Sequence, residues 1–168
     1  MNLHLLRHSN ATEHPPAGRG DEARPLTAAG RAKCRVIGDA LQRLDLRFDL
    51  VLSSPAVRAR ETAELVLARL KPRPPLEFLD ALWIGGSRAA LIRRLKRQPA
   101  ACADVLLVGH EPDLGLLVSH LTSGGQGFKV TFKKGGLARL AIPRLRDGAC
   151  GSLEWLLTPR QLRLLADC

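Results

Sequence analysis

Short runs of aliphatic residues alternate with longer stretches of helical periodicity along most of this chain. Three such runs, residues 2–6, 50–52 and 105–108, are each followed by a segment long enough for a loop and a helix. Parallel strands need a crossover connection of this kind, whereas antiparallel strands can be joined by a tight turn. The alternation therefore predicts an α/β fold built around a mostly parallel sheet.

The expected elements follow from this pattern and from turn and capping residues. Strands are expected at residues 2–7, 49–53, 76–79 and 104–109, and helices at residues 28–46, 55–70, 88–96 and 112–121. Thr27 suits the N-cap of the first helix, and four consecutive aliphatic residues within 104–109 indicate a strand buried on both faces. The last third differs, because residues 136–142 and 152–157 indicate a hairpin that precedes a closing helix at 159–166.

The length and composition are those of a protein with a single hydrophobic core. The chain has 168 residues, of which 45% are hydrophobic, and it shows no repeat, linker or low-complexity tract. A single domain over residues 1–168 is therefore expected.

The charge balance favours acidic partners. The chain has 26 basic and 16 acidic residues, which gives a net charge of +10. Phosphorylated small molecules, phosphoproteins and nucleic acid are all compatible with that charge, as is a merely solvated basic surface. Aromatic residues make up only 4% of the chain and the basic residues are dispersed, so specific nucleic-acid binding is not expected.

Cysteine usage and hydropathy bear on the compartment. Cys34, Cys102, Cys150 and Cys168 are scattered without a CxxC spacing, which favours free thiols in a reducing cytoplasm. The N-terminal apolar stretch is too short for a signal peptide, and no apolar window approaches the length of a membrane span. A cytoplasmic protein without membrane contact is expected.

Basic and imidazole side chains stand at three expected strand ends. Arg7 and His8 end the first strand, Arg58 follows the second near a helix start, and His110 directly follows the strand at 104–109. Ligand sites of open α/β sheets lie at these carboxyl ends, and helix N-termini favour anions. A neutral histidine can attack phosphorus while arginine neutralises the phosphoryl oxygens. Taken alone, each of these residues is also compatible with a structural role or with simple exposure to solvent.

The other histidines have simpler interpretations. His4, inside the first strand, is expected to be buried with a local hydrogen bond, and His14 and His120 have no supporting context. His4 and His8 share a strand face, but no third ligand is evident and two arginines would repel a cation. Neither a metal nor another cofactor is expected.

The fragments together resemble the histidine phosphatase superfamily, which includes phosphoglycerate mutases and many acid phosphatases. The family's Arg-His-Gly signature is similar to residues 7–9, its Ser-Pro-x-x-Arg-x-x-x-Thr segment to residues 54–62, and its later Gly-His to residues 109–110. Its Pro-Leu-Thr-x-x-Gly stretch resembles residues 25–30. The short chain and the segments 109–113, 134–137 and 157–162 resemble the SixA branch of phosphohistidine phosphatases.

This resemblance implies a fold and a set of roles. The fold would be a three-layer α/β/α sandwich like that of phosphoglycerate mutase, without a large cap insertion. His8 would be the nucleophile that forms a phosphohistidine intermediate, and Arg7, Arg58 and His110 would bind the phosphoryl oxygens. Arg24 is a further candidate contact at the rim, and Ser9, which replaces the family's glycine, places a hydroxyl near the phosphate.

The general acid is a departure from the family pattern. Many members have a glutamate after the third strand, where this chain has Ala81. Asp80 and Glu111 are the alternative candidates. A phosphoramidate protonated on nitrogen departs without an acid, whereas an alkoxide does not. The missing acid therefore favours phosphohistidine as the substrate.

The expected function is removal of a phosphoryl group from phosphohistidine in a protein. The partner would then be a phosphorylated protein, such as a histidine-phosphotransfer domain. The expected context is signal transduction. A general phosphomonoesterase acting on small phosphorylated substrates and a non-catalytic phosphoprotein-binding module are the alternatives. An intact His8 favours an enzyme over a binding module.

Overall fold

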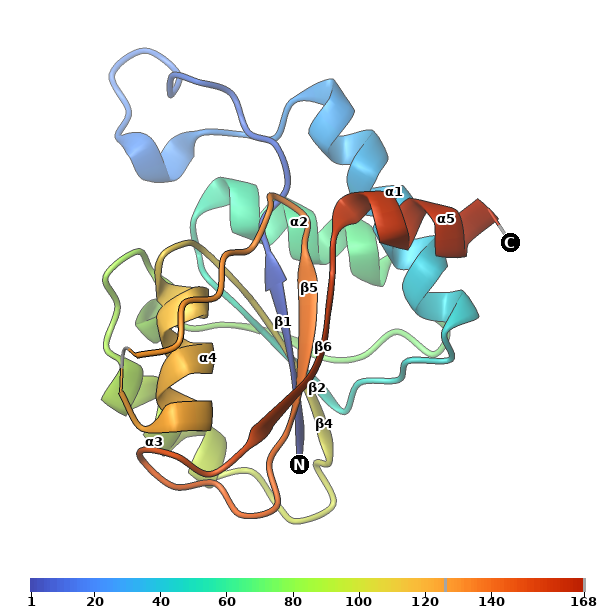
Figure 1. The fold of residues 1–168 in the computed structure, drawn as a ribbon. Helices are drawn as coiled ribbons and strands as arrows, with labels where there is room; N and C mark the ends of the chain where they lie inside the picture. The colour runs from blue at the N-terminus through green and yellow to red at the C-terminus, as the bar shows by residue number, and fades with distance from the viewer. Residues whose placement is uncertain (126, 168) are drawn as a thin grey trace.

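A six-stranded sheet with the order β3-β2-β4-β1-β5-β6 forms the centre of the protein. The structure is a computed structural model that describes residues 1–125 and 127–167 (Figure 1). The strands are β1 (Asn2–Arg7), β2 (Leu50–Ser53), β3 (Leu76–Phe78), β4 (Asp104–Gly109), β5 (Leu137–Ala141) and β6 (Ser152–Leu157). The first four run parallel, and the hairpin of β5 and β6 adds two antiparallel strands beside β1.

Helices cover both faces of this sheet (Figure 1). On one face lie α1 (Ala28–Arg43), α2 (Val57–Leu67) and α5 (Pro159–Asp167); on the other lie α3 (Arg88–Lys96) and α4 (Asp113–Ser123). Two short 3₁₀ helices, η1 (Asp21–Ala23) and η2 (Asp80–Leu82), lie in loops. Alternate residues of β1 serve different cores, since Leu5 packs towards α4 whereas Leu6 packs towards α1 and α2. The expected three-layer α/β/α sandwich is confirmed.

The expected element boundaries need several corrections. The first helix ends at Arg43 rather than residue 46, because Asp45 adopts a left-handed φ of 49° and turns the backbone. The second begins at Val57 rather than Pro55, because Ala56 has an extended ψ of 135°, and it ends at Leu67 rather than residue 70. The fourth extends to Ser123, where Gly124 in the left-handed region ends it.

His4 is buried as expected, but its hydrogen bond is not local. Its Nε2 lies 3.1 Å from Oδ1 of Asp104, which is 100 residues away in sequence and on the neighbouring strand. The ring also packs against Phe48 and Trp155. The pairing of β1 with β4 therefore supplies the hydrogen-bond partner of His4, and the sequence alone did not predict it.

The thiols of Cys34, Cys102 and Cys150 are free, and Cys168 lies outside the described residues. Among the residues that the structure describes, no helix has both the length and the apolar character needed to cross a bilayer.

Strand register brings three strand ends to one level. Arg7 of β1 is paired with Gly109 of β4, and Ser53 of β2 is paired with Val108 of β4. The residue after each strand continues the alignment, since the amide of His8 donates to the Gly109 carbonyl at 3.0 Å. The side chains that follow β1, β2 and β4 are thus placed at one edge of the sheet.

The start of α1 is fixed against the chain that leaves His8. Thr27 Oγ1 accepts a hydrogen bond from the Gly30 amide at 3.0 Å and donates to the Asn10 carbonyl at 3.3 Å. A Cβ on Gly30 would lie 2.1 Å from that same carbonyl oxygen, so the close approach requires glycine. The segment 25–30 therefore supports the loop after the nucleophile candidate.

We expect Thr27→Ala to lower the free energy of unfolding by about 1 kcal/mol, because the helix loses its N-cap acceptor. Urea unfolding followed by circular dichroism measures this change. Thr27→Ser retains the hydroxyl and should stay close to wild type; an equal loss in both variants would show that the methyl group, not the cap, matters.

Candidate active site

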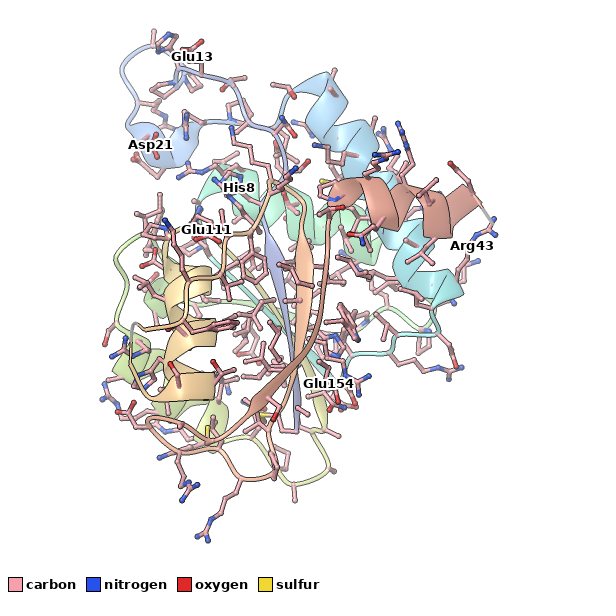
Figure 2. All side chains as sticks on the ribbon, in the orientation of Figure 1. His8, Glu13, Asp21, Arg43, Glu111 and Glu154 are labelled. Carbon is pink, nitrogen blue, oxygen red and sulfur yellow. The ribbon has the colours of Figure 1, made fainter. Side chains whose placement is uncertain are left out.

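His8 lies at the end of β1 with its reactive nitrogen defined by its neighbour. The side chain is only 5% exposed, and its Nδ1 lies 2.7 Å from the Ser9 carbonyl oxygen. Figure 2 shows where His8 lies in the molecule. A carbonyl can only accept, so Nδ1 carries the proton and donates it. The lone pair of the neutral ring is therefore on Nε2, which is the atom available for attack.

His110 faces His8 across the strand ends. The two ring centroids are 5.0 Å apart, and His110 Nε2 lies 2.8 Å from Ser54 Oγ. That hydroxyl oxygen already accepts from the Ala56 amide at 3.3 Å, so its own proton is free to go to His110 Nε2. The other ring nitrogen of His110, Nδ1, is buried and has no hydrogen-bond partner.

Arg7 and Arg58 each donate to a main-chain oxygen and have further N–H donors to spare. Arg7 Nη1 donates to the Phe132 carbonyl at 2.6 Å, and Arg58 Nη1 donates to the Asp21 carbonyl at 2.8 Å. Nε of both arginines is buried without a partner, as is His110 Nδ1. Buried donors are seldom left unpaired, because each costs roughly 1–3 kcal/mol. The two Nε–H donors suit the oxygens of a phosphoryl group, as does His110 Nδ1 in the tautomer that carries its proton there.

Burial and surrounding charge keep both histidines neutral. Burial is the main reason that the pKa of His8 falls to about 3, and the charges of Arg58 and Arg7 lower it further. The pKa of His110 falls to about 4, again through burial first and then the charge of Arg58. Since only neutral imidazole has a lone pair to offer, this environment favours a nucleophilic His8 near neutral pH.

Asp21 is a site residue that the sequence reasoning missed. Its Oδ2 accepts from Arg58 Nη2 at 2.9 Å, and its Oδ1 lies 2.9 Å from Arg24 Nε. The sequence did contain a clue to this contact. Asp21 stands three residues before Arg24 in the segment that precedes α1, a spacing at which the two side chains can pair. The predicted rim residue Arg24 therefore joins the site through this carboxylate, which occupies donors of Arg58 that a phosphate could use.

Ser9 is buried, and its hydrogen bonds run towards the helices. Its Oγ donates to the Gly30 carbonyl at 3.0 Å and its amide donates to Thr62 Oγ1 at 3.1 Å. The hydroxyl thus helps to anchor the loop after His8. A direct contact between Ser9 and substrate stays a prediction.

The two acid candidates have different surroundings. Glu111 Oε1 accepts from the Phe132 amide at 2.7 Å, and the carbonyl of that same residue holds Arg7. Glu111 therefore positions Arg7 through the backbone. Asp80 begins η2 and is exposed to solvent. A proton-donating role for either residue stays a prediction.

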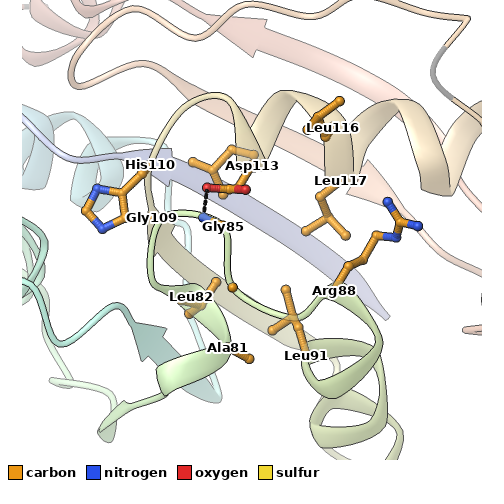
Figure 3. A pocket seen from close by; sticks show the side chains of 12 residues that line it. Ala81, Leu82, Gly85, Arg88, Leu91, Gly109, His110, Asp113, Leu116 and Leu117 are labelled. Atoms are coloured by element: carbon orange, nitrogen blue, oxygen red, sulfur yellow. Dashed lines mark hydrogen bonds between the residues drawn. The ribbon is translucent and has the colours of Figure 1, made fainter.

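A mostly apolar hollow of about 220 Å³ lies beside His110, which contributes to its lining. Figure 3 shows the residues that line it. Ala81, Leu82 and Leu114 contribute to its wall, and Asp113 at its rim accepts from the Gly85 amide at 3.0 Å. The family resemblance predicts an acid at the position of Ala81. The side chain that lines the hollow at this position is a methyl group.

Comparisons with known proteins agree with this geometry. The model of the histidine phosphatase superfamily (branch 1) matches residues 3–82. The chain is 35% identical over 166 residues to an uncharacterized protein of Picosynechococcus, covering 96% of this chain and 99% of the relative. It is 27% identical to phosphohistidine phosphatase SixA of Escherichia coli, covering 98% of each chain.

A solved structure of the protein histidine phosphatase SixA complexed with tungstate superimposes with a TM-score of 0.83 at 28% identity. It covers 96% of this chain and 99% of that one. The chain belongs to the histidine phosphatase superfamily, in its SixA branch. Membership supports phosphatase activity, while the roles of the individual site residues stay predictions.

We expect His8 to remain neutral when the pH is lowered from 7 to 5, because its pKa lies near 3, below the value of about 6.5 for a peptide histidine. Nitrogen chemical shifts of the ring, recorded by NMR across this range, report the tautomer directly. A histidine-containing peptide in the same buffer provides the reference. Protonation of His8 together with that peptide would contradict the buried, neutral assignment.

We expect Asp21→Asn to strengthen binding of inorganic phosphate about two- to fivefold, the modest effect appropriate to a carboxylate that remains largely exposed. The substitution removes the negative charge that competes for Arg58 while keeping the main-chain carbonyl contact. Competitive inhibition by phosphate measures the change. Glu22→Gln removes the same charge one residue away; an equal gain there would indicate a general charge effect.

Proposed function

We propose that this protein removes the phosphoryl group from phosphohistidine in a protein through a covalent intermediate on His8. The observation that carries the proposal is the fixed tautomer of His8, whose Nδ1–H is bound to the Ser9 carbonyl so that Nε2 can attack. The unpartnered donors of Arg7, Arg58 and His110 are the groups that would bind the phosphoryl oxygens.

In the first step, the lone pair of His8 Nε2 forms a bond to phosphorus while the bond from phosphorus to the leaving nitrogen breaks. The electron pair of the broken bond stays on that nitrogen, and the imidazole that leaves is the substrate's own histidine. Positive charge that develops on His8 is stabilised through Nδ1–H and the Ser9 carbonyl. Charge on the phosphoryl oxygens is met by donors already in place, which avoids reorganisation.

In the second step, water attacks the phosphorus of phosphorylated His8. The bond to Nε2 breaks and its electron pair returns to His8, while both protons of the water stay on the phosphate, which leaves as dihydrogen phosphate. The same arginines serve both steps, because the phosphoryl group stays in the same place while the group in line with it changes from histidine to water.

The leaving group determines which substrate fits best. A phosphorylated imidazole that is protonated on its other nitrogen departs as a neutral ring, so it needs no acid at the position of Ala81. The name of the Escherichia coli relative, phosphohistidine phosphatase, supports the same substrate class. The protein that carries this phosphohistidine would be a histidine-phosphotransfer domain in signal transduction.

A general phosphomonoesterase is the second candidate, and the mostly apolar hollow beside His110 is the observation that favours it. Such a hollow suits the organic part of a small phosphate ester. The substrate class would then include small phosphorylated molecules.

We expect His8→Ala to lower the rate on a phosphohistidine peptide by about 10³-fold or more, because the covalent step is lost. His14→Ala, which alters an exposed histidine in the loop that follows β1, should retain full activity. Release of inorganic phosphate measures both, and circular dichroism checks that each variant is folded. Equal rates for wild type and His8→Ala would rule out the nucleophile.

The same assay on a simple alkyl phosphate separates the two candidates. Wild type should hydrolyse the phosphohistidine peptide much faster. Comparable rates on the two substrates would favour the phosphomonoesterase.

A further inference from the structure

A hollow lined by basic side chains lies beside the predicted nucleophile. It encloses about 590 Å³, and we call it the basic hollow; its lining residues are Asn10, Lys33, Lys133, Lys134, Thr158 and Arg160, with Pro159 at the start of α5. These residues come from four separate parts of the chain: the loop after β1, helix α1, the turn before β5, and the junction of β6 with α5. The site already described uses none of the four cations.

The basic hollow adjoins the segment that carries His8. The Gly135 amide donates to the carbonyls of Arg7 and His8, at 3.1 and 3.2 Å. Gly135 directly follows Lys133 and Lys134, and Asn10 lies two residues beyond His8. The carboxyl end of β1, the start of β5 and the end of β6 all meet at this edge of the sheet (Figure 1). A chain that leaves the phosphate pocket on this side therefore enters the basic hollow.

The positive charge in the basic hollow is not neutralised by the protein. Within residues 1–125 and 127–167, Lys33, Lys133, Lys134 and Arg160 take part in no ion pair. Lys33 is half-buried and donates instead to the neutral Asn10 side chain at 2.5 Å. Burial lowers the pKa of Lys33, and the charge of Lys134 lowers it further. Cations placed this close without a counter-ion favour an anionic ligand.

The charge continues away from the site. A second hollow between α1 and α5 shares Lys33 and Arg160 with the first and adds Arg163. The combined surface extends along two helices, which suits an extended ligand better than one small anion. No aromatic side chain lines either hollow, so bases would find no stacking surface there.

We propose that the basic hollow binds acidic side chains next to the phosphorylated residue of a protein substrate. This deepens the proposed function and rests on it, because it assumes that the phosphoryl group in the pocket belongs to a polypeptide. The phosphoryl group would contact Arg7 and Arg58 while neighbouring Asp or Glu residues meet Lys133, Lys134 and Arg160. Such contacts raise the association rate and select among partners, and they weaken with salt.

The test reverses the charge of the basic hollow and leaves the phosphate pocket intact. The variant is Lys133→Glu with Lys134→Glu, two exposed side chains whose loss removes no described hydrogen bond. The matched control is Arg144→Glu with Arg146→Glu, which makes the same charge change at exposed positions in the turn between β5 and β6, at the far end of the sheet. The substrates are a phosphohistidine peptide flanked by Asp and Glu, the same peptide with Asn and Gln, and free phosphoramidate.

We expect the Lys133 and Lys134 variant to lower kcat/KM for the acidic peptide about tenfold at low salt. Its effect on the neutral peptide should be much smaller, phosphoramidate should be hydrolysed as by wild type, and added salt should reduce the difference. The control variant should stay close to wild type on all three substrates. Equal losses on both peptides, or equal losses in both variants, would overturn the proposal.

A binding measurement separates this proposal from the proposed function. Fluorescence anisotropy with the unphosphorylated acidic peptide reports the basic hollow even if no phosphohistidine peptide is hydrolysed. Binding that the Lys133 and Lys134 variant loses supports the basic hollow, whereas the absence of binding to wild type contradicts it. Single-stranded DNA that binds wild type more tightly than the acidic peptide, and loses that binding in the variant, would assign the surface to nucleic acid instead.

Discussion

Parallel pairing of β4 with both β1 and β2 is the constraint on which the rest of this structure depends. It sets Arg7 opposite Gly109 and Ser53 opposite Val108, so the residues that leave these strands start from one level. His8 and His110 then lie 5.0 Å apart between their ring centroids, although 102 positions separate them in the sequence. A shift of one residue in either pairing would turn alternate side chains to the opposite face and take this site apart.

Burial makes the site chemically useful. A histidine among arginines in a dry pocket stays neutral, because a charged ring would lose its hydration and face like charges. The same burial leaves nitrogen atoms of Arg7, Arg58 and His110 without partners, an arrangement that the proposed phosphoryl group would complete. Asp21 places a carboxylate beside Arg58, which is a predicted phosphate ligand. The uncompensated lysines of the basic hollow extend positive charge from this pocket along α1 and α5.

Sequence reasoning predicted the elements well wherever a local signal existed. Strand β4 and helix α3 have the expected boundaries, and Thr27 caps α1 as its position suggested. It failed where distant segments meet. The hydrogen-bond partner of His4 is Asp104 on another strand, and Asp21 reaches Arg58 across 37 positions. The bond from the Phe132 amide to Glu111 was likewise not foreseen, while an acid role for Glu111 stays a prediction. No periodicity or cap encodes such contacts, because they form only when the chain folds.

By itself, the sequence determined the class of fold, the family and the candidate residues for the chemistry, because alternating apolar runs and strand-end motifs are local properties of the chain. Only the tertiary structure decided how those residues are placed. It set Nδ1 of His8 against the Ser9 carbonyl and placed Asp21 between Arg58 and Arg24. It also gathered Lys33, Lys133 and Arg160 into one hollow. The reason is physical: hydrogen-bond geometry, desolvation and the summation of charge depend on distances in space.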